Sequence, residues 1–437
     1  MKRGIVWALV GLGLFACSGA GDVPTNDAGT STDASADLDT SLPTNDAASP
    51  VDSGATDARP EDAAKDASLD ATTDAADAAD AADAADAAPP PMPAVQYIGR
   101  WDLSGAEAVA AYPASRMVVK FRGTGAEVTA RDSFNETWLE VSVDGQAPTS
   151  VRVQGAQART LVLAENLPMG DHTVEVYKRT EAFSGVLRLS GITFPNGGAL
   201  LPPPPRKARR IEIIGNSTLS GYGVEGNRGD AACSTNAVHN ARRSLIQLLA
   251  TALDAEDYAP TVSGTGVLYN ETPTDTNLIH VTYPRTLPRA ATPTWDFTSW
   301  QPHVVVIMVG GTDLSNPSVD PPPTQAAFAT AYAQFLQTVR SKNPNALIVA
   351  ATSPTTSNFY PTNDINGQPY MARTKMIGGI ADAVAARVAA GDTKVKTFTF
   401  MPASDTELGA CQYHPTFALY QRMTAELAPF IRTELGW

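Results

Sequence analysis

A serine in the middle of the chain and a histidine near its end have the residue types of a nucleophile and its base. Ser217 lies in IEIIGNSTLSGYG (211–223), where an apolar run ends in Gly-Asn-Ser. His414 lies in CQYHP (411–415), just before the last helical pattern. A serine hydroxyl is a weak nucleophile until a neighbouring imidazole can take its proton. The pair therefore indicates acyl transfer. The structural alternative, in which Ser217 caps a turn and His414 packs its helix, stays open on the motif alone.

The elements that must position this pair alternate between strand and helix from residue 208 to residue 437. The strand-like runs are IEIIG, APTVSG, HVVVIMVG, ALIVAAT and KVKTFTF, and the helical patterns lie near 236–253, 324–341, 371–390 and 416–435. Five strands with crossover helices predict an α/β fold, a flavodoxin-like three-layer domain with a five-stranded parallel sheet. Binding sites of such sheets lie at the carboxyl ends of the strands. The motifs fall at these ends, which favours the catalytic interpretation.

A different pattern precedes this region. Residues 94–200 contain short alternating runs, which are RMVVKF, AEVTARD, TWLEVSVDG, RTLVLAENL, DHTVEVYKR and GVLRLSGITF. Turn signals such as Asp144-Gly145 separate them. This pattern predicts an antiparallel β-sandwich of the jelly-roll type. LPPPPRK (201–207) is expected to be a stiff linker between the two domains.

The N-terminus has the features of an export signal. Lys2 and Arg3 precede an apolar run from Ile5 to Ala16, which is too short to span a bilayer and is typical of a signal peptide. The sequence Leu-Phe-Ala-Cys at its end resembles the lipobox of bacterial lipoproteins, which implies that residues 1–17 are the signal segment and that Cys17 is lipidated. We therefore expect an exported protein, anchored by lipid to a bacterial outer membrane or cell surface. Secretion without an anchor is the second interpretation.

Residues 18–93 are expected to form a disordered tether. They consist mainly of Asp, Ala, Ser, Thr and Pro, with an aspartate at every third position from Asp74 to Asp86. Large apolar side chains are nearly absent, so ordering this segment would not be compensated by burial. Residues 21–94 carry 17 acidic and 2 basic side chains, whereas the net charge of the whole chain is −14. The acidity therefore belongs to the tether, and no basic surface for nucleic acid is predicted.

Three cysteines are present in the chain. If Cys17 carries lipid, Cys233 and Cys411 remain as a pair, and an exported chain permits a disulfide between them. A dithiol metal site is the competing use of these two cysteines. The histidines other than His414 show no metal-ligand spacing, so we predict no metal and no cofactor.

The motifs together resemble carbohydrate esterase family 2, within the SGNH (GDSL) hydrolases. The matching pieces are YIGRWD at the start of the predicted sandwich, GNSTLSGYG, VSGTGVLYN (262–270), Cys233 and CQYHP. The resemblance covers essentially all of 95–437. It implies a serine carboxylic-ester hydrolase of the acetylxylan esterase type that removes acetyl groups from sugar hydroxyls of polysaccharides or oligosaccharides, commonly of xylan or glucomannan. We expect a monomer that contacts the membrane only through its lipid.

The resemblance also implies roles for individual residues. The oxyanion of the tetrahedral intermediate needs preorganised donors. The expected donors are the backbone N–H of Ser217 and that of a glycine, with Gly266 as the first choice and Gly264 as the second. Thr312 stands where the family has an asparagine that donates its side-chain amide, and Asp313 is expected to organise the turn after its strand. Tyr222 and Tyr413 flank the predicted site and would either stack on a sugar or pack internally.

Two further departures concern the charges around the pair. Asn216 replaces the aspartate before the nucleophile and can keep the hydrogen bonds of the turn. Gln412 stands where the family often has the aspartate that orients the histidine. Either its amide oxygen or a backbone carbonyl would then orient His414. We therefore predict a Ser–His dyad. The alternative function is a catalytically degenerate, polysaccharide-binding lipoprotein with the same fold.

Overall fold

The computed structural model describes residues 95–437. The predicted signal segment, the Cys17 lipidation site and the acidic tether lie outside the described residues. Within the described part, no helix combines the length and the hydropathy that a bilayer-spanning segment needs.

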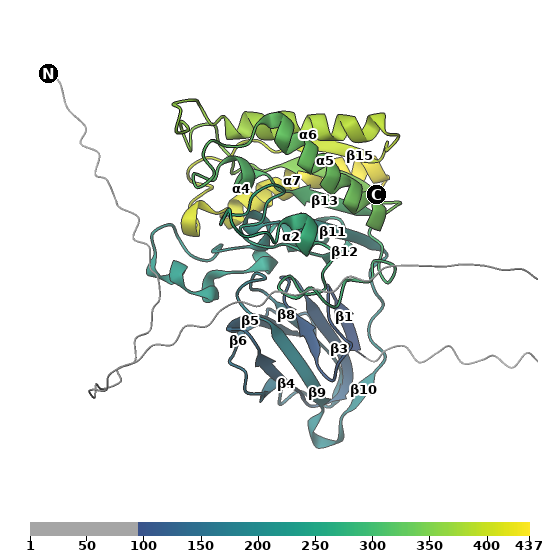
Figure 1. The fold of residues 1–437 in the computed structure, drawn as a ribbon. Coiled ribbons are helices and arrows are strands. Elements are labelled where there is room, and N and C mark those ends of the chain that lie inside the picture. Colours follow the sequence, from purple (N-terminus) through teal and green to yellow (C-terminus); the bar gives the residue numbers. More distant parts are fainter. Residues whose placement is uncertain (1–94) are drawn as a thin grey trace, which may run out of the picture. The chain divides into compact units, whose positions relative to one another are not determined.

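The first part of the described chain is a β-sandwich of two antiparallel sheets (Figure 1). One sheet has the order β1-β3-β8-β5-β6, with β10 also paired to β3, and the other has the order β2-β9-β4-β7. Their bounds are β1 Val95–Ile98, β2 Ala108–Ala110, β3 Arg116–Gly123, β4 Ala126–Asp132, β5 Glu136–Val143, β6 Thr149–Gln154, β7 Arg159–Ala164, β8 Gly170–Lys178, β9 Leu187–Thr193 and β10 Ala199–Leu201. Alternate side chains of β4 are fully buried, as one core-facing side of a strand requires. The predicted antiparallel sandwich is confirmed.

The second part contains a parallel sheet in the order β12-β11-β13-β14-β15. The bounds are β11 Arg209–Gly215, β12 Ala255–Tyr258, β13 Val304–Met308, β14 Leu347–Thr352 and β15 Val395–Thr399. This is the flavodoxin-like order, in which the chain direction across the sheet reverses between β11 and β13. The carboxyl ends of these two strands therefore form the crevice in which a site is expected, and the predicted five-stranded parallel sheet is confirmed.

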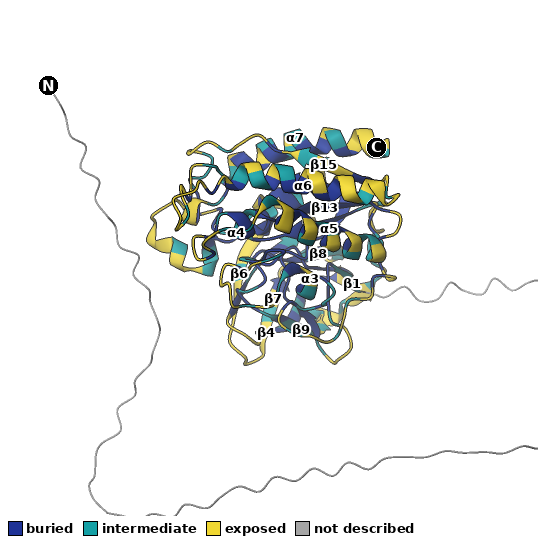
Figure 2. Cartoon of the chain, turned by 45° about the horizontal axis from the view of Figure 1, so that its top comes forward, coloured by how far each residue is buried: buried dark blue, intermediate teal, exposed yellow. Residues whose placement is uncertain are grey.

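Helices cover both faces of this sheet (Figure 1). Helices α2 (Leu245–Ala252) and α7 (Phe417–Leu435) pack on one face, and α5 (Gln325–Lys342) and α6 (Ala372–Ala389) pack on the other. Figure 2 shows buried strands between helices whose outer sides are exposed. The short helices are α1 Ser217–Ser220, α3 Ile279–Thr282 and α4 Gly311–Leu314, and the 3-10 turns are η1 Pro195–Gly197, η2 Ala231–Ser234, η3 Asn236–Val238, η4 Ala241–Arg243 and η5 Cys411–Tyr413.

The prediction of one strand was wrong in its position. The expected strand APTVSG (259–264) is mostly a loop, joined to the sheet by a single bridge between Gly215 and Thr261. The strand is the preceding segment Ala-Glu-Asp-Tyr, whose acidic residues are buried because the sandwich and the linker pair with them. Arg116 of β3 forms an ion pair with Asp257, and Arg206 of the linker binds Glu256 at 2.8 Å. The sandwich thus covers the edge of the sheet at β12.

Candidate active site

Ser217 is placed at the carboxyl end of β11 by a tight turn. Asn216, 6% exposed, caps helix α1 by accepting the Thr218 N–H at 3.3 Å. Its amide nitrogen donates to the Thr265 carbonyl at 3.4 Å and to Thr312 Oγ1 at 3.3 Å. Asn216 therefore ties the turn of the nucleophile to the loops after β12 and β13. Among residues 95–437, no group is hydrogen-bonded to the Ser217 hydroxyl or its backbone N–H, so both are free for a ligand.

A small polar pocket of about 130 Å³ opens beside Ser217. Its lining residues come from the carboxyl ends of β11, β13 and β14 and are Asn216, Ser217, Thr218, Met308, Val309, Gly311, Thr312, Ser315, Ser353, Thr355 and Thr356. Thr312 thus shares a pocket with the serine, as its expected role requires. The abundance of hydroxyl groups and the small volume suit a short, polar acyl group.

The structure corrects the expected oxyanion donor in the loop after β12. The N–H of Gly266 donates to Asn270 Oδ1 at 3.1 Å, so it is not available. Gly266 is a glycine because a Cβ there would lie 2.2 Å from the Tyr269 carbonyl oxygen. The second choice, Gly264, has a φ of +71° and is half-buried. No acceptor for its N–H is present among residues 95–437, so Gly264 is the better candidate.

Asp313 organises the loop that carries these glycines. It is fully buried and accepts the backbone N–H groups of Val267, Leu268 and Tyr269 at 3.2, 2.6 and 3.0 Å. A carboxylate that binds three N–H groups fixes the course of a loop strongly. This contact agrees with the structural role expected for Asp313 and extends it from its own turn to the neighbouring loop.

His414 lies on a loop that packs against the loop after Ser217. The Cys411 N–H donates to the Gly223 carbonyl at 3.4 Å, and the ring centroids of His414 and Tyr222 are 4.5 Å apart. Nδ1 of His414 lies 3.0 Å from the Cys411 carbonyl oxygen. A carbonyl can only accept, so Nδ1 carries the proton and the Nε2 lone pair is left to act as a base. Within the described chain, no direct hydrogen bond joins Ser217 to His414.

Of the two orienting groups expected for His414, the Gln412 amide and a backbone carbonyl, the structure shows the carbonyl. The Gln412 amide oxygen accepts from the Tyr222 hydroxyl at 3.2 Å, and the backbone carbonyl of Cys411 takes the orienting position instead. Burial lowers the pKa of His414 below its ordinary value, although the carbonyls of Cys411 and Gln412 oppose this shift. The imidazole is thus neutral and able to accept a proton near neutral pH.

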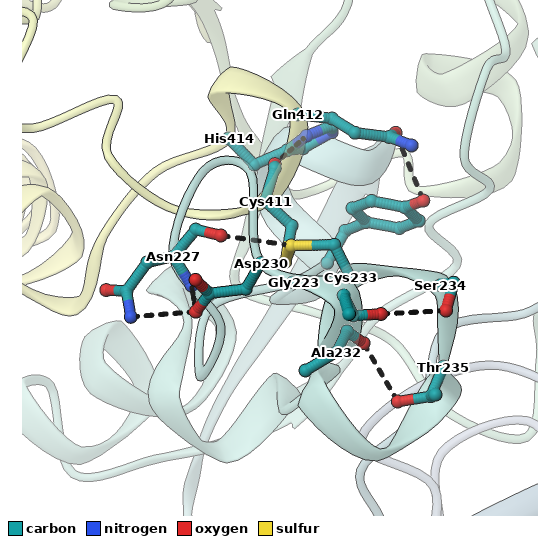
Figure 3. Close-up of a disulfide and its surroundings, with 12 residues drawn as sticks. Gly223, Asn227, Asp230, Ala232, Cys233, Ser234, Thr235, Cys411, Gln412 and His414 are labelled. Atoms are coloured by element: carbon teal, nitrogen blue, oxygen red, sulfur yellow. Dashed lines mark hydrogen bonds between the residues drawn. A yellow bond between two sulfur atoms is a disulfide. The ribbon is translucent and has the colours of Figure 1, made fainter. Parts of the chain in front are cut away.

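Cys233 and Cys411 form a disulfide, as the cysteine count predicted (Figure 3). The bond joins η2, which follows the loop after Ser217, to Cys411, whose carbonyl oxygen lies 3.0 Å from Nδ1 of His414. Gly223 and Gly226 pack on Cys411 so closely that a Cβ on either would lie 2.4 and 2.5 Å from its side chain. The disulfide and the two glycines therefore clamp the histidine loop on the nucleophile loop.

The two tyrosines differ in their surroundings. Tyr222 is half-buried between the rings of His414 and His239, which leaves it poorly placed to stack on a sugar. Tyr413 is 62% exposed, and the Arg228 guanidinium lies 4.6 Å from its ring centroid. His239 was not identified from the sequence, because no motif indicates that it packs beside Tyr222. Among the described residues, no group of three or more metal-ligating side chains is gathered in one place.

Comparisons with known proteins agree with this geometry. Residues 97–204 match the family model described as carbohydrate esterase 2 N-terminal, and residues 213–422 match the GDSL-like lipase/acylhydrolase family. The structure of a family two carbohydrate esterase from Clostridium thermocellum, in complex with cellohexaose, is 30% identical, with a TM-score of 0.70. The match covers 78% of this chain and 99% of that chain. The chain belongs to carbohydrate esterase family 2.

Two curated relatives of this carbohydrate esterase family 2 member extend the comparison. The cellulase/esterase CelE of Acetivibrio thermocellus is 32% identical over 349 residues, which are 79% of this chain but only 40% of the relative. An acetylxylan esterase/glucomannan deacetylase of Cellvibrio japonicus is 26% identical over 349 residues, 90% of its length. The family resemblance drawn from the motifs is thereby confirmed.

Proposed function

We propose that the protein is an exported carbohydrate O-acetyl esterase that deacetylates a plant-type polysaccharide, xylan or glucomannan, through Ser217 and His414. The observation that carries the proposal is a serine with a free hydroxyl beside a small polar pocket, next to a loop that holds a neutral histidine with its Nδ1 proton fixed. Membership in a carbohydrate esterase family supports the reaction class.

The reaction follows from these groups. Ser217 Oγ attacks the acetyl carbonyl carbon while His414 Nε2 takes the serine proton, and the imidazolium then gives it to the leaving sugar oxygen. The N–H groups of Ser217 and Gly264 and the Thr312 hydroxyl would donate to the oxyanion. Water, deprotonated by His414, then releases acetate. The serine–histidine hydrogen bond would form on substrate binding, because such contacts are often long in unliganded sites.

The surroundings of the site support a short acyl group on a long carbohydrate. The pocket of about 130 Å³ beside Ser217 has room for an acetyl group. Tyr413, directly before His414 in the chain, is 62% exposed. Exposed aromatic rings near a cleft are suited to stacking on sugar rings. The cellohexaose in the related structure agrees with a glycan ligand.

Export and anchoring rest on the sequence, with one structural support. From the signal segment and the lipobox at Cys17, we infer a lipoprotein of the outer membrane or cell surface. The Cys233–Cys411 disulfide supports an oxidising compartment outside the cytosol.

The test is the hydrolysis of 4-nitrophenyl acetate and acetylated xylan by the wild type, Ser217→Ala and His414→Ala. Each variant should lose activity by roughly 10⁴-fold or more, since removal of a member of such a catalytic unit leaves only binding and oxyanion stabilisation. The matched controls are Ser341→Ala and His280→Ala, both exposed and away from the site, which should behave as wild type. An inert wild type that still retains acetylated xylan in a pull-down would support the polysaccharide-binding alternative.

A further inference from the structure

Tyr222, five positions after the nucleophile, is held between two imidazole rings. Its ring centroid lies 4.5 Å from that of His414, with 38° between the planes, and 4.3 Å from that of His239, with 53° between the planes. Its hydroxyl is bound to the Gln412 amide, so the ring cannot turn freely. The tyrosine is thus positioned against the catalytic base rather than toward solvent.

The base lacks the group that usually stabilises its charged form. When Ser217 Oγ transfers its proton to Nε2, His414 becomes an imidazolium, yet its Nδ1–H faces a neutral carbonyl and no carboxylate. Burial disfavours this cation. An aromatic ring within about 6 Å attracts a cation electrostatically, and the attraction is strongest where water is excluded.

We propose that Tyr222 is a positioning residue that stabilises the imidazolium of His414 through its ring, in the place of the missing triad carboxylate. The inference rests on the proposed function, since it concerns the charged state of His414 that acyl transfer creates. It also gives a reason for the close packing of the GYG segment on the histidine loop.

His239 completes the arrangement by remaining uncharged. It is 4% exposed, and its Nδ1 accepts the Gly223 N–H at 2.9 Å, so its proton is on Nε2. Burial, together with smaller contributions from His414, Arg179 and Lys178, lowers the pKa of His239 to about 3. A second cation beside Tyr222 is therefore avoided. Arg179, directly after β8, donates to the His239 carbonyl at 2.9 Å. The sandwich therefore helps to hold His239 against Tyr222.

Other charges near the tyrosine are few. Burial raises the pKa of Tyr222, and Glu181 and Glu271 contribute to this rise. Glu181 is 6% exposed and lies in the loop after β8, whereas Glu271 follows the glycine loop and is exposed. Neither carboxylate is hydrogen-bonded to His414 in the described part of the chain, so the ring is the immediate neighbour that faces the imidazole.

The experiment compares Tyr222→Leu with Tyr222→Phe. Leucine removes the aromatic face, so kcat on 4-nitrophenyl acetate should fall about tenfold with KM within about twofold, and the pKa of His414, followed by NMR titration, should fall by about half a unit or more. Phenylalanine keeps the face and loses only the bond to Gln412, so it should retain at least about a third of kcat. If Tyr222→Leu does not fold, His239→Gln takes its place. Glutamine can still accept the Gly223 N–H but removes the imidazole ring that holds Tyr222 against His414, so the same changes in kcat and in the pKa of His414 are expected.

Trp437→Leu is the matched control. The ring centroid of Trp437 lies 5.8 Å from that of His303, which directly precedes β13 and so lies at the amino end of the central strand, away from Ser217. Removal of the Trp437 ring should leave kcat and the titration of His414 unchanged. The proposal is overturned if Tyr222→Leu keeps the wild-type kcat and the wild-type pKa of His414. It is also overturned if Tyr222→Leu raises only KM, which would indicate that the ring binds a sugar. A third contradicting result is an equal loss of kcat in Tyr222→Phe and Tyr222→Leu. A wild type inert on every ester, whose His414 titration still responds to Tyr222→Leu, would sink the proposed function and leave the ring–imidazolium contact standing.

Discussion

Ser217 and the loop that faces it are held by strand ends and by buried hydrogen bonds. His414, in contrast, lies on the loop between β15 and α7, and this loop is held by a disulfide and by the ring of Tyr222. On the first side, Asn216 and Asp313 each follow a central strand and bind the neighbouring loop. On the second side, Gln412 and Tyr413 have left-handed backbone angles, with φ of 50° and 59°. Such conformations each cost roughly 1–3 kcal/mol and persist only where the surroundings impose them.

This difference shows what each position needs. A residue next to a strand end is positioned by the sheet. A few hydrogen bonds, such as those of Asn216 and Asp313, are then enough to fix its orientation. A residue on a long loop needs local constraints, and here a covalent bond, two close glycine contacts and a closely packed aromatic ring provide them. The two sides should therefore respond differently to substitution.

Apart from the loss of Ser217 or His414 themselves, the largest effect is expected on the nucleophile side from Asp313→Asn. The amide would turn an N–H toward backbone N–H groups or leave some of them unbound, which costs about 3 kcal/mol of stability. Because the Gly264 loop loses its anchor, activity on 4-nitrophenyl acetate should fall about a hundredfold, the range known for loss of an oxyanion donor. Asp254→Asn, which removes an exposed pair with Lys207, is the control and should change the melting temperature little. A variant with wild-type kcat would show that the loop is held by other contacts.

The next effect is expected from removal of the disulfide by Cys233→Ser with Cys411→Ala. The bond closes a loop with a sequence separation of 178 residues, so its loss should lower the free energy of unfolding by about 2–4 kcal/mol. Since the Cys411 carbonyl orients His414, kcat should also fall about tenfold, the factor for a change of 1.4 kcal/mol. Thiol titration of the denatured, unreduced wild type should find no free thiol at these two positions. Reductant should lower the activity of the wild type and leave that of the double variant unaffected.

A smaller effect concerns pH. A base whose folded-state pKa is lowered stays neutral at lower pH, so the acid limb of kcat/KM should have its midpoint below 6.5, the ordinary value for histidine. By the same sign, the contribution of neutral His414 to stability is present above 6.5 and is lost as the pH falls through its folded pKa. A midpoint above 6.5, measured on 4-nitrophenyl acetate, would mean that a carboxylate stabilises the imidazolium.

The smallest effect is expected from Gln412→Asp. A carboxylate at this position would restore the residue type common in the family, but Nδ1 of His414 already donates to the Cys411 carbonyl. The aspartate side chain would also lose the bond to the Tyr222 hydroxyl. Turnover should therefore stay within about threefold of wild type, well under the 10⁴-fold effect of losing the acid in a true triad. A large rise in kcat would show that the carbonyl is a poor substitute for the charge.

The sequence was a good guide to the nucleophile side. The apolar run of β11 and the Gly-Asn-Ser that follows it placed Ser217 at a strand end, and the same reasoning placed Thr312 after β13. The preference for Gly266 over Gly264 was wrong, because both are glycines and only the partner of each N–H distinguishes them. The strand β12 was missed since its buried Glu256 and Asp257 resemble a surface segment until their arginine partners are known.

The histidine side was less predictable. The pattern CQYHP indicated His414 and the cysteine pair, but spacing along the chain could not show that a backbone carbonyl would take the position of Gln412. The packing of His239 against Tyr222 depends on two 3-10 turns between them, η2 and η3, and on Arg179 of the sandwich, a contact between distant segments. Local patterns do not contain this information.

The Cys233–Cys411 bond also affects what happens when a protease attacks the folded enzyme. The exposed segment around Phe359 and Tyr360 lies between the two cysteines, and both of its aromatic side chains are accessible. A single cut there would leave two fragments that remain one covalent molecule. Each fragment would still contribute its own member of the Ser217–His414 pair, so a single cut there would not separate the two residues.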